Sequence, residues 1–323
     1  MPDYSQHPLN KSYDLDTSLS SLWEFYKKWF GSLFVISFVF SLVTTYLSGR
    51  VDIAGIYSMD DTGEMMDALG SVLGAYALIY LFTFTFTLVL QYYVIIKPLD
   101  PENSVFTIGI EGIKKYFFPL LALYIILAVF AVIAIMLGFF VFVVGALFAI
   151  IYIVMIAAFI SPVLMIENPG GIGDTINTSI RLAHKRFWPN IGWVTIFVIL
   201  LLVISFILSA LVMIPYGGSF LKSITNPGST DEVMNLASKP SFIILSALAN
   251  AVTMPLFPIF SLVLYFNGRS AAGRSSFNNK PDSKGGGDRI KIEDLYADPG
   301  KDKKKESRKK ADPPPPSVDD LSP

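Results

Sequence analysis

The sequence predicts an all-α membrane protein with six transmembrane helices, arranged as three hairpins that are each preceded by a cytoplasmic-side interfacial amphipathic helix. Composition is the first observation: of the 323 residues, 53% are hydrophobic and only 16% are charged, whereas a soluble domain is nearer a quarter charged. The second is a run of 51 residues, Tyr116 to Ile166, that contains no Asp, Glu, Lys, Arg or His. A helical crossing takes about 20 residues, so this run predicts two consecutive spans.

Six apolar segments are long enough to cross a bilayer. None contains a charged residue, as expected because a central Lys or Asp costs about 2.5 to 3.5 kcal/mol on insertion. The predicted spans cover residues 30–48, 69–96, 117–137, 145–166, 191–214 and 241–266. Glycine permits a tight reversal between spans three and four, within 138–144. The chain therefore divides into a polar leader (1–17), a six-helix membrane domain (18–268) and a tail (269–323).

Lysine and arginine are distributed unequally between the two sides that this threading defines. Of the 25, the N-terminal segment before span one, the second and fourth connections and the tail hold 22, and the opposite side holds only Arg50, Lys222 and Lys239. Basic residues are retained in the cytoplasm, so both termini are predicted to be cytoplasmic.

A recurring pattern opens each odd-numbered span. The segments KKWF (27–30), KKYFF (114–118) and KRFW (185–188) each follow an amphipathic stretch at helical spacing. An apolar stripe with a basic face predicts a helix that lies in the membrane interface. The alternative is that any multi-pass protein places basic and aromatic residues at such borders. The candidate lipid- or partner-binding residues are Lys27, Lys28, Lys114, Lys115, Arg181, Lys185 and Arg186.

The glycine-rich stretch ENPGGIGDT (167–175) lies between spans four and five. A phosphate-binding P-loop needs a preceding strand and Lys–Ser/Thr after its last glycine, whereas Asp174 and Thr175 follow Gly173 here. The dinucleotide-binding pattern is also missing. We therefore interpret Pro169 and the glycines as the end of span four, and predict that Asp174 or Thr175 caps the third amphipathic helix.

This segment also carries a resemblance. Glu167-Asn168 closing a span, a glycine-rich turn, Ser179-x-x-Leu182 and Phe187-Trp188 opening the next span resemble the membrane domain attached to some bacterial glycerophosphodiester phosphodiesterases and its stand-alone relatives. LYFNGR (264–269) is similar to that family's aromatic–Asp–Leu–Arg ending, with Asn267 and Gly268 in place of Asp and Leu. The resemblance covers residues 20–275 in layout. It implies a six-helix domain of the bacterial inner membrane without an established catalytic residue.

Few residues are suited to catalysis or metal binding. The chain has no cysteine, which excludes disulfides, iron–sulfur clusters and thiolate zinc sites. The two histidines, His7 and His184, cannot form a histidine metal cluster. An external acidic segment offers carboxylates for calcium or acid–base chemistry but lacks the alternation of a calcium-binding hand. Its acids are Asp60, Asp61, Glu64 and Asp67. We predict no metal, no cofactor and no catalytic residue; an enzyme that uses this segment is an alternative.

The spans lack the ionisable groups that ion-coupled transporters keep there. Their remaining polar and kinking residues form a possible transport path: Gln91, Asn250, Thr253, Pro255 and Pro258. Ser161-Pro162 is predicted to kink span four, and Pro255 and Pro258 are predicted to kink span six, because proline removes a backbone donor. Helix–helix packing is the other interpretation of the same residues.

The tail is rich in Gly, Ser, Asn, Lys and Asp, and contains KDKKKESRKK (301–310) and PPPP (313–316). This composition predicts a disordered basic cytoplasmic tail. Its basic cluster either contacts the anionic inner leaflet or is simply solvated. Nucleic acid is not a predicted partner, because no aromatic residues interleave the lysines.

These patterns predict a non-enzymatic membrane module that organises lipids or partner proteins at the cell envelope. Its expected partners are membrane lipids, anionic ones included, and membrane proteins or a second copy of the chain. The alternative is a permease or lipid-translocating protein that works through the kinked spans four and six.

Overall fold

The computed structural model describes residues 3–11, 14–51, 61–168, 170–218, 225 and 235–278. These residues form no strand and include six helices that are long and apolar enough to cross a membrane. The six are Asp16–Ser48, Thr62–Ile96, Val105–Phe139, Val143–Glu167, Phe187–Tyr216 and Pro240–Ser270. Each contains one predicted span, so the all-α, multi-pass membrane fold is confirmed. Residues 1–277 form one unit, to which the following description applies.

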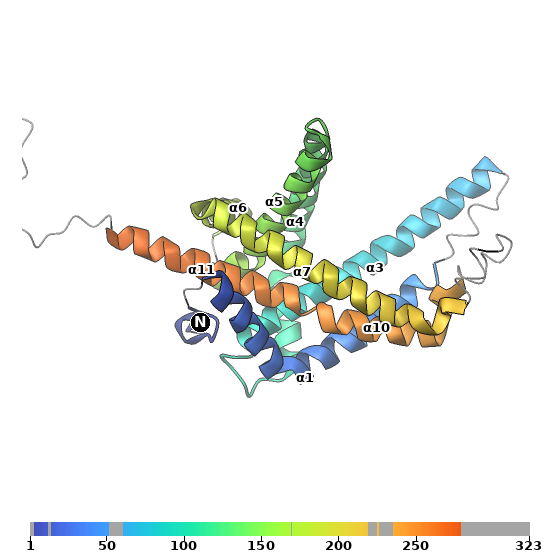
Figure 1. Ribbon diagram of the computed structural model, residues 1–323, viewed down its shortest axis with the longest axis horizontal. Coiled ribbons are helices and arrows are strands. Elements are labelled where there is room, and N and C mark those ends of the chain that lie inside the picture. Colours follow the sequence, from blue (N-terminus) through green and yellow to red (C-terminus); the bar gives the residue numbers. More distant parts are fainter. Residues whose placement is uncertain are drawn as a thin grey trace, which may run out of the picture. The chain divides into compact units, whose positions relative to one another are not determined.

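The first two amphipathic stretches are continuous with the spans that follow them. Helix α1 (Leu15–Ser48) and helix α4 (Val105–Phe139) each contain both parts. The start of α4 is fixed by Ser104, whose Oγ accepts a hydrogen bond from the Thr107 N–H at 3.1 Å. Figure 1 shows that α1 bends between its two parts, and the pair Gly31-Ser32 lies at their junction.

The third amphipathic stretch is a separate helix. Helix α6 (Ile172–Lys185) ends at Arg186, whose φ of −131° and ψ of 56° are not helical, and α7 (Phe187–Met213) begins with the next residue. Pro189 lacks the N–H that would extend α6. The buried Asn190 side chain donates instead to the carbonyl of Ala183 at 2.8 Å. This replaces a lost helical hydrogen bond, so the break is stable.

The capping prediction for this helix was wrong by a few residues. The N-cap of α6 is Gly171, and Asp174 lies in the first turn. There its carboxylate is favoured by the positive end of the helix dipole. The Thr175 hydroxyl donates back to the Gly171 carbonyl at 2.9 Å.

The fourth span ends in a wide helical turn. Helix α5 (Phe142–Pro162) passes into the π-helical turn η2 (Val163–Glu167), which ends at Asn168 with a left-handed φ of 44°. Pro162 cannot donate to the carbonyl of Ala158 four residues earlier. Ser261 of the sixth span donates to that carbonyl at 2.5 Å, so an inter-helix hydrogen bond replaces the missing one.

The sixth span consists of two helices, α10 (Pro240–Thr253) and α11 (Leu256–Asn278). The interruption comes at Met254-Pro255, as expected for a proline within an apolar segment. The Tyr26 hydroxyl donates to the Val252 carbonyl beside it at 2.9 Å. Helix α11 also extends beyond residue 269, where we had placed the start of the disordered tail. The basic cluster 301–310 lies outside the described residues.

The spans pack in chain order and close on themselves. Helix α3 (Thr62–Ile96) packs on α4, α4 on α5, α5 on α7, and α7 on α10. Helix α1 packs more extensively on α10 than on α3. The short elements are the 3-10 turns η1 (Tyr4–Gln6), η3 (Ile214–Tyr216) and η5 (Asn235–Ser238). The first and last spans are therefore neighbours.

The two ends of the bundle differ in packing. Helices α1, α4 and α7 begin at one end of the bundle, and α3 and α5 finish there. We call this the basal end and the opposite one the distal end. The buried core lies at the basal end, in 86–96 of α3, 155–166 of α5 and 256–266 of α11. In Figure 1 the α4–α5 hairpin and the first half of α3 leave this base as separate arms, and their apolar side chains are mostly exposed.

One close contact holds the distal turn between α4 and α5. A Cβ added at Gly138 would lie 2.8 Å from the backbone of Ala146, and one added at Gly145 would collide with the Gly138 carbonyl. Glycine is needed here for the approach of two backbones; both residues have ordinary φ angles. The predicted glycine-dependent reversal within 138–144 thus lies where expected.

Candidate functional site

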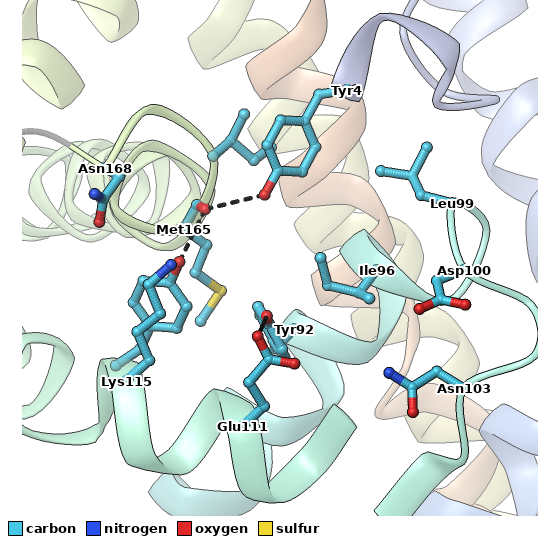
Figure 2. A pocket seen from close by; sticks show the side chains of 12 residues that line it. Tyr4, Tyr92, Ile96, Leu99, Asp100, Asn103, Glu111, Lys115, Met165 and Asn168 are labelled. Carbon is cyan, nitrogen blue, oxygen red and sulfur yellow. Dashed lines mark hydrogen bonds between the residues drawn. The ribbon is translucent and has the colours of Figure 1, made fainter. Parts of the chain in front are cut away.

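A polar pocket of about 480 Å³ opens at the basal end. Figure 2 shows the side chains that line it, which come from the leader, the end of α3, the α3–α4 loop, the start of α4 and the turn η2. The lining residues are Tyr4, Tyr92, Ile96, Leu99, Asp100, Asn103, Glu111, Lys115, Tyr116, Met165, Ile166 and Asn168. Five separate segments therefore meet around one cavity.

Three tyrosine hydroxyls form hydrogen bonds at its walls. Tyr92 donates to Oε1 of Glu111 at 3.0 Å. Tyr116 and Tyr4 both approach the carbonyl of Met165, at 3.2 and 3.5 Å. Burial raises the pKa of Tyr4 above its ordinary value, with the nearby Tyr116 and Glu111 adding to the effect. The Tyr4 hydroxyl is therefore protonated and available as a donor at neutral pH.

The α3–α4 loop that forms one wall is held by a lysine. The Lys97 ammonium donates to the carbonyls of Pro101 and Asn103, at 2.6 and 2.7 Å. These bonds fold the loop so that Asp100 and Asn103 line the pocket. On the opposite side the π-helical turn η2 presents the Met165 carbonyl, in a type of helical turn that is frequent at functional sites.

Of the lining residues only Lys115 was among the predicted site residues. Tyr4 and Tyr92 carry no local signal, because they meet Glu111 and Met165 only through the tertiary fold. Glu111 had a signal: it is the only acid between Glu102 and Glu167. An isolated acid in an otherwise basic and apolar border is a candidate for a specific contact.

The leader is packed into the base of the bundle, which the sequence did not indicate. His7 is only 2% exposed and lies between the rings of Phe25 and Phe266, with centroid distances of 6.0 and 5.4 Å. The Leu9 N–H donates to His7 Nδ1 at 3.2 Å, and Nε2 lies 3.3 Å from the Val94 carbonyl. A ring that accepts at Nδ1 and donates at Nε2 is neutral. Burial lowers the pKa of His7 to about 4.

The predicted basic residues lie where the spans of α1, α4 and α7 begin, at the basal end. Lys27 and Lys28 of α1, and Lys114 and Lys115 of α4, are all exposed. Three of these ammonium groups lie over aromatic rings: Lys27 over Trp23 at 6.0 Å, Lys28 over Trp29 at 5.9 Å and Lys115 over Tyr116 at 5.0 Å. From the third border, Arg181 and Lys185 are exposed and Arg186 is half-buried.

An apolar groove of about 190 Å³ runs between α6 and the α4–α5 hairpin. Ile176 and Ile180 form the α6 side of the groove, and Tyr152 belongs to its α5 side. His184 follows one turn after Ile180, and its Nε2 lies 3.4 Å from the Tyr152 hydroxyl. Arg181 and Lys185 of the same helix are exposed and do not line the groove. The groove itself is therefore apolar.

Residues from the two motifs that carry the family resemblance are hydrogen-bonded to each other in the structure. Tyr265 of α11 donates to Oε1 of Glu167 at 3.0 Å, and Nη1 of Arg269 donates to the Tyr265 hydroxyl at 3.2 Å. The GR ending of the sixth span is thereby linked to the end of the fourth. This connection gives the two short motifs a common structural role.

The possible transport-path residues do not form one group. Thr253 and Pro258 line a cavity of about 300 Å³ between α3, α7 and the interruption of the sixth span. Gln91 is buried and donates to the Pro258 carbonyl at 3.5 Å. Pro255 causes the interruption, and Asn250 is exposed and does not line the cavity. Gln91 therefore satisfies a backbone group, as the packing interpretation expects.

The acidic segment is used in part to start a helix. The Asp61 carboxylate caps α3 by accepting from the Gly63 N–H at 2.6 Å, and Glu64 lies in the first turn. Asp67 is exposed, and Asp60 lies outside the described residues. Within the described part of the chain, no group of three or more His, Asp or Glu side chains is placed to hold a metal ion.

Comparisons with protein-family models, with curated proteins and with solved structures find no match to this chain. The likeness to the bacterial phosphodiesterase-associated membrane domain therefore stays a prediction from short motifs. Function has to be inferred from the geometry of the base.

Proposed function

We propose that this protein is a non-enzymatic module of the bacterial inner membrane that binds anionic lipids at its basal end and so organises lipids or partner proteins there. The proposal places the basal end and both termini on the cytoplasmic side. The observation that carries it is that each of three basic borders, from α1, α4 and α6–α7, lies where an odd-numbered span begins, at the basal end of the bundle. Each basic side chain near the surface contributes about 1 kcal/mol of attraction to anionic lipid.

The groove between α6 and the α4–α5 hairpin supports the same function. Its isoleucine wall suits an acyl chain, and the basic residues exposed elsewhere on α6, Arg181 and Lys185, suit the anionic headgroups of the surrounding lipid. Lipids are amphipathic in the same sense, with an apolar chain below an anionic headgroup.

Removal of the paired charges tests this function. The full chain carrying glutamine at positions 27, 28, 114, 115, 185 and 186 is purified, and its retention of phosphatidylglycerol over phosphatidylcholine is measured by native mass spectrometry. We expect at least about a tenfold loss of selective retention, since several charges of about 1 kcal/mol each are removed. Substitution of Arg50 and Lys239 by glutamine is the matched control on the distal side. Unchanged selectivity in the basal variant would refute the proposal.

The interruption of the sixth span favours a second candidate function, a permease or lipid-translocating protein. Broken helices border the substrate sites of many transporters, and here the break adjoins the 300 Å³ cavity. Reconstituted vesicles should then show flux of a solute or lipid above protein-free vesicles. Thr253→Val and Pro255→Ala are expected to alter that flux, while Asn250→Ala, outside the cavity, is expected to change it less. Flux equal to that of protein-free vesicles across a broad panel would exclude this function.

A further inference from the structure

The polar pocket of Figure 2 is rich in hydrogen-bond acceptors. The hydroxyl hydrogens of its tyrosines are directed at protein groups, that of Tyr92 at Glu111 and those of Tyr4 and Tyr116 at the Met165 carbonyl. What each hydroxyl retains for a ligand is an oxygen lone pair. The walls therefore offer a set of oxygen acceptors to whatever enters.

Two carboxylates strengthen this character. Glu111 uses Oε1 for Tyr92 and keeps Oε2, and Asp100 lines the wall formed by the α3–α4 loop. Lys115 supplies the cationic group, and Figure 2 shows it on the side of the pocket opposite Asp100, with Glu111 between the two. The pocket thus offers two carboxylates and one ammonium group to a ligand.

An organic ammonium fits this arrangement better than a metal ion. The described residues provide no cluster of three acidic or histidine ligands, and the Lys115 ammonium would repel a bare cation. A primary ammonium instead carries three N–H donors that can reach separate acceptors.

We propose that the pocket binds a small zwitterion that bears a primary ammonium and an anionic group, of the phosphoethanolamine class. The ammonium lies against Glu111 and Asp100, and the anionic group lies against Lys115. The volume of about 480 Å³ equals that of roughly sixteen liquid waters, which is ample for such a group. This site extends beyond the proposed function, since its ligand is recognised by its amine and not by net negative charge.

Two sources carry this chemistry: a free solute, or the headgroup of an aminophospholipid. The full chain in detergent is dialysed against radiolabelled phosphoethanolamine, and the purified chain is separately embedded in nanodiscs of phosphatidylcholine with or without phosphatidylethanolamine. Saturable binding of the free compound identifies a solute site. Enrichment of phosphatidylethanolamine around the protein without binding of the free compound identifies a headgroup site. If neither result is obtained with up to about 10 mM free probe, the proposal is overturned.

Phosphocholine and ethanolamine test the two halves of the recognition. Phosphocholine has no N–H donor, so we expect it to bind at least tenfold more weakly than phosphoethanolamine. Ethanolamine lacks the anionic group, so its weaker binding should not depend on Lys115. Equal binding of phosphocholine and phosphoethanolamine would contradict recognition through ammonium hydrogen bonds.

Matched variants locate the site. Glu111→Gln keeps an acceptor for Tyr92 but removes the charge, and we expect at least a tenfold loss of the binding found in the source test. Glu102→Gln, in the neighbouring loop but outside the pocket, should bind normally. Lys115→Ala should weaken phosphoethanolamine binding, while Lys11→Ala, exposed in the leader and outside the lining, should not. Equal effects within either pair would place binding elsewhere, and the pocket would be rejected.

Discussion

The basal and distal ends of the bundle are made from the same six uncharged spans, but they differ in how those spans contact one another. At the base, aromatic stacks and polar side chains aimed at backbone carbonyls tie the helices together; Phe197 stacks on Phe260 with centroids 3.9 Å apart. At the distal end the apolar side chains are mostly exposed, as with Phe206, two turns further along α7. Hydrophobicity therefore determines where the chain lies, and specific contacts determine where it packs.

The largest effect should come from deleting a basal stack. Phe197→Ala removes a fully buried ring, and we expect it to cost about 3–5 kcal/mol of unfolding free energy. Phe206→Ala removes the same group from a site 77% exposed on the same helix, and should change stability by less than about 0.5 kcal/mol. Unfolding of the purified protein in mixed micelles of rising SDS content measures both. Similar losses would mean that the two ends are packed alike.

A smaller loss is expected at the tight contact in the turn between α4 and α5. Gly138→Val places a side chain against the Ala146 backbone, and overpacking of this kind costs about 1–3 kcal/mol. Gly70→Ala, where an added Cβ meets nothing within 4 Å, should be neutral or stabilising by up to about 1 kcal/mol. The same unfolding assay applies. A tolerated valine would show that the distal turn opens freely.

Next in size is the loss of a carbonyl partner at the base. Pro162 has no N–H to donate to the Ala158 carbonyl, so Ser261→Ala leaves this buried carbonyl without its hydrogen bond. We expect this to cost about 1–2 kcal/mol of unfolding free energy. Ser209→Ala, exposed on α7, is the control and should leave unfolding unchanged. No difference between the two serines would show that another group satisfies Ala158.

The smallest effect on the stability of the bundle should come from protonation of His7 in the leader. The pKa of His7 falls from an ordinary 6.5 to about 4 on burial, so the undocked leader binds the proton more readily. Docking should be complete above about pH 6.5 and weaken as the pH falls towards 4. Because the chain lacks cysteine, a single thiol can be introduced by Leu9→Cys. Its labelling rate reports how often the leader undocks and exposes position 9.

His7→Phe keeps an aromatic ring between Phe25 and Phe266 but cannot be protonated. In that background the labelling rate of Leu9→Cys, divided by that of the exposed Lys11→Cys at the same pH to cancel the titration of the thiol itself, should not depend on pH between 4 and 6.5. A dependence that persists would assign the opening to another titrating group.

Hydropathy and charge were sufficient to predict the fold class and the six spans, because insertion into a bilayer depends on summed composition. Continuity of the amphipathic stretches was not predictable from periodicity, since α6 is set apart by one proline and the side chain of Asn190. The pocket escaped prediction because Tyr4, Tyr92 and Glu111 are far apart along the chain. The leader was likewise predicted only as a polar segment, because His7 and Leu9 are buried by residues far away along the chain.

The docking of His7 against Phe266 has a consequence for biogenesis. Residues 3–11 leave the ribosome before the six spans, but one wall of their binding site is translated only after more than 250 further residues. This segment must therefore wait in the aqueous phase until the sixth span has been inserted. Its burial can then serve as the closing event of assembly, which a protease-protection assay on truncated nascent chains would follow step by step.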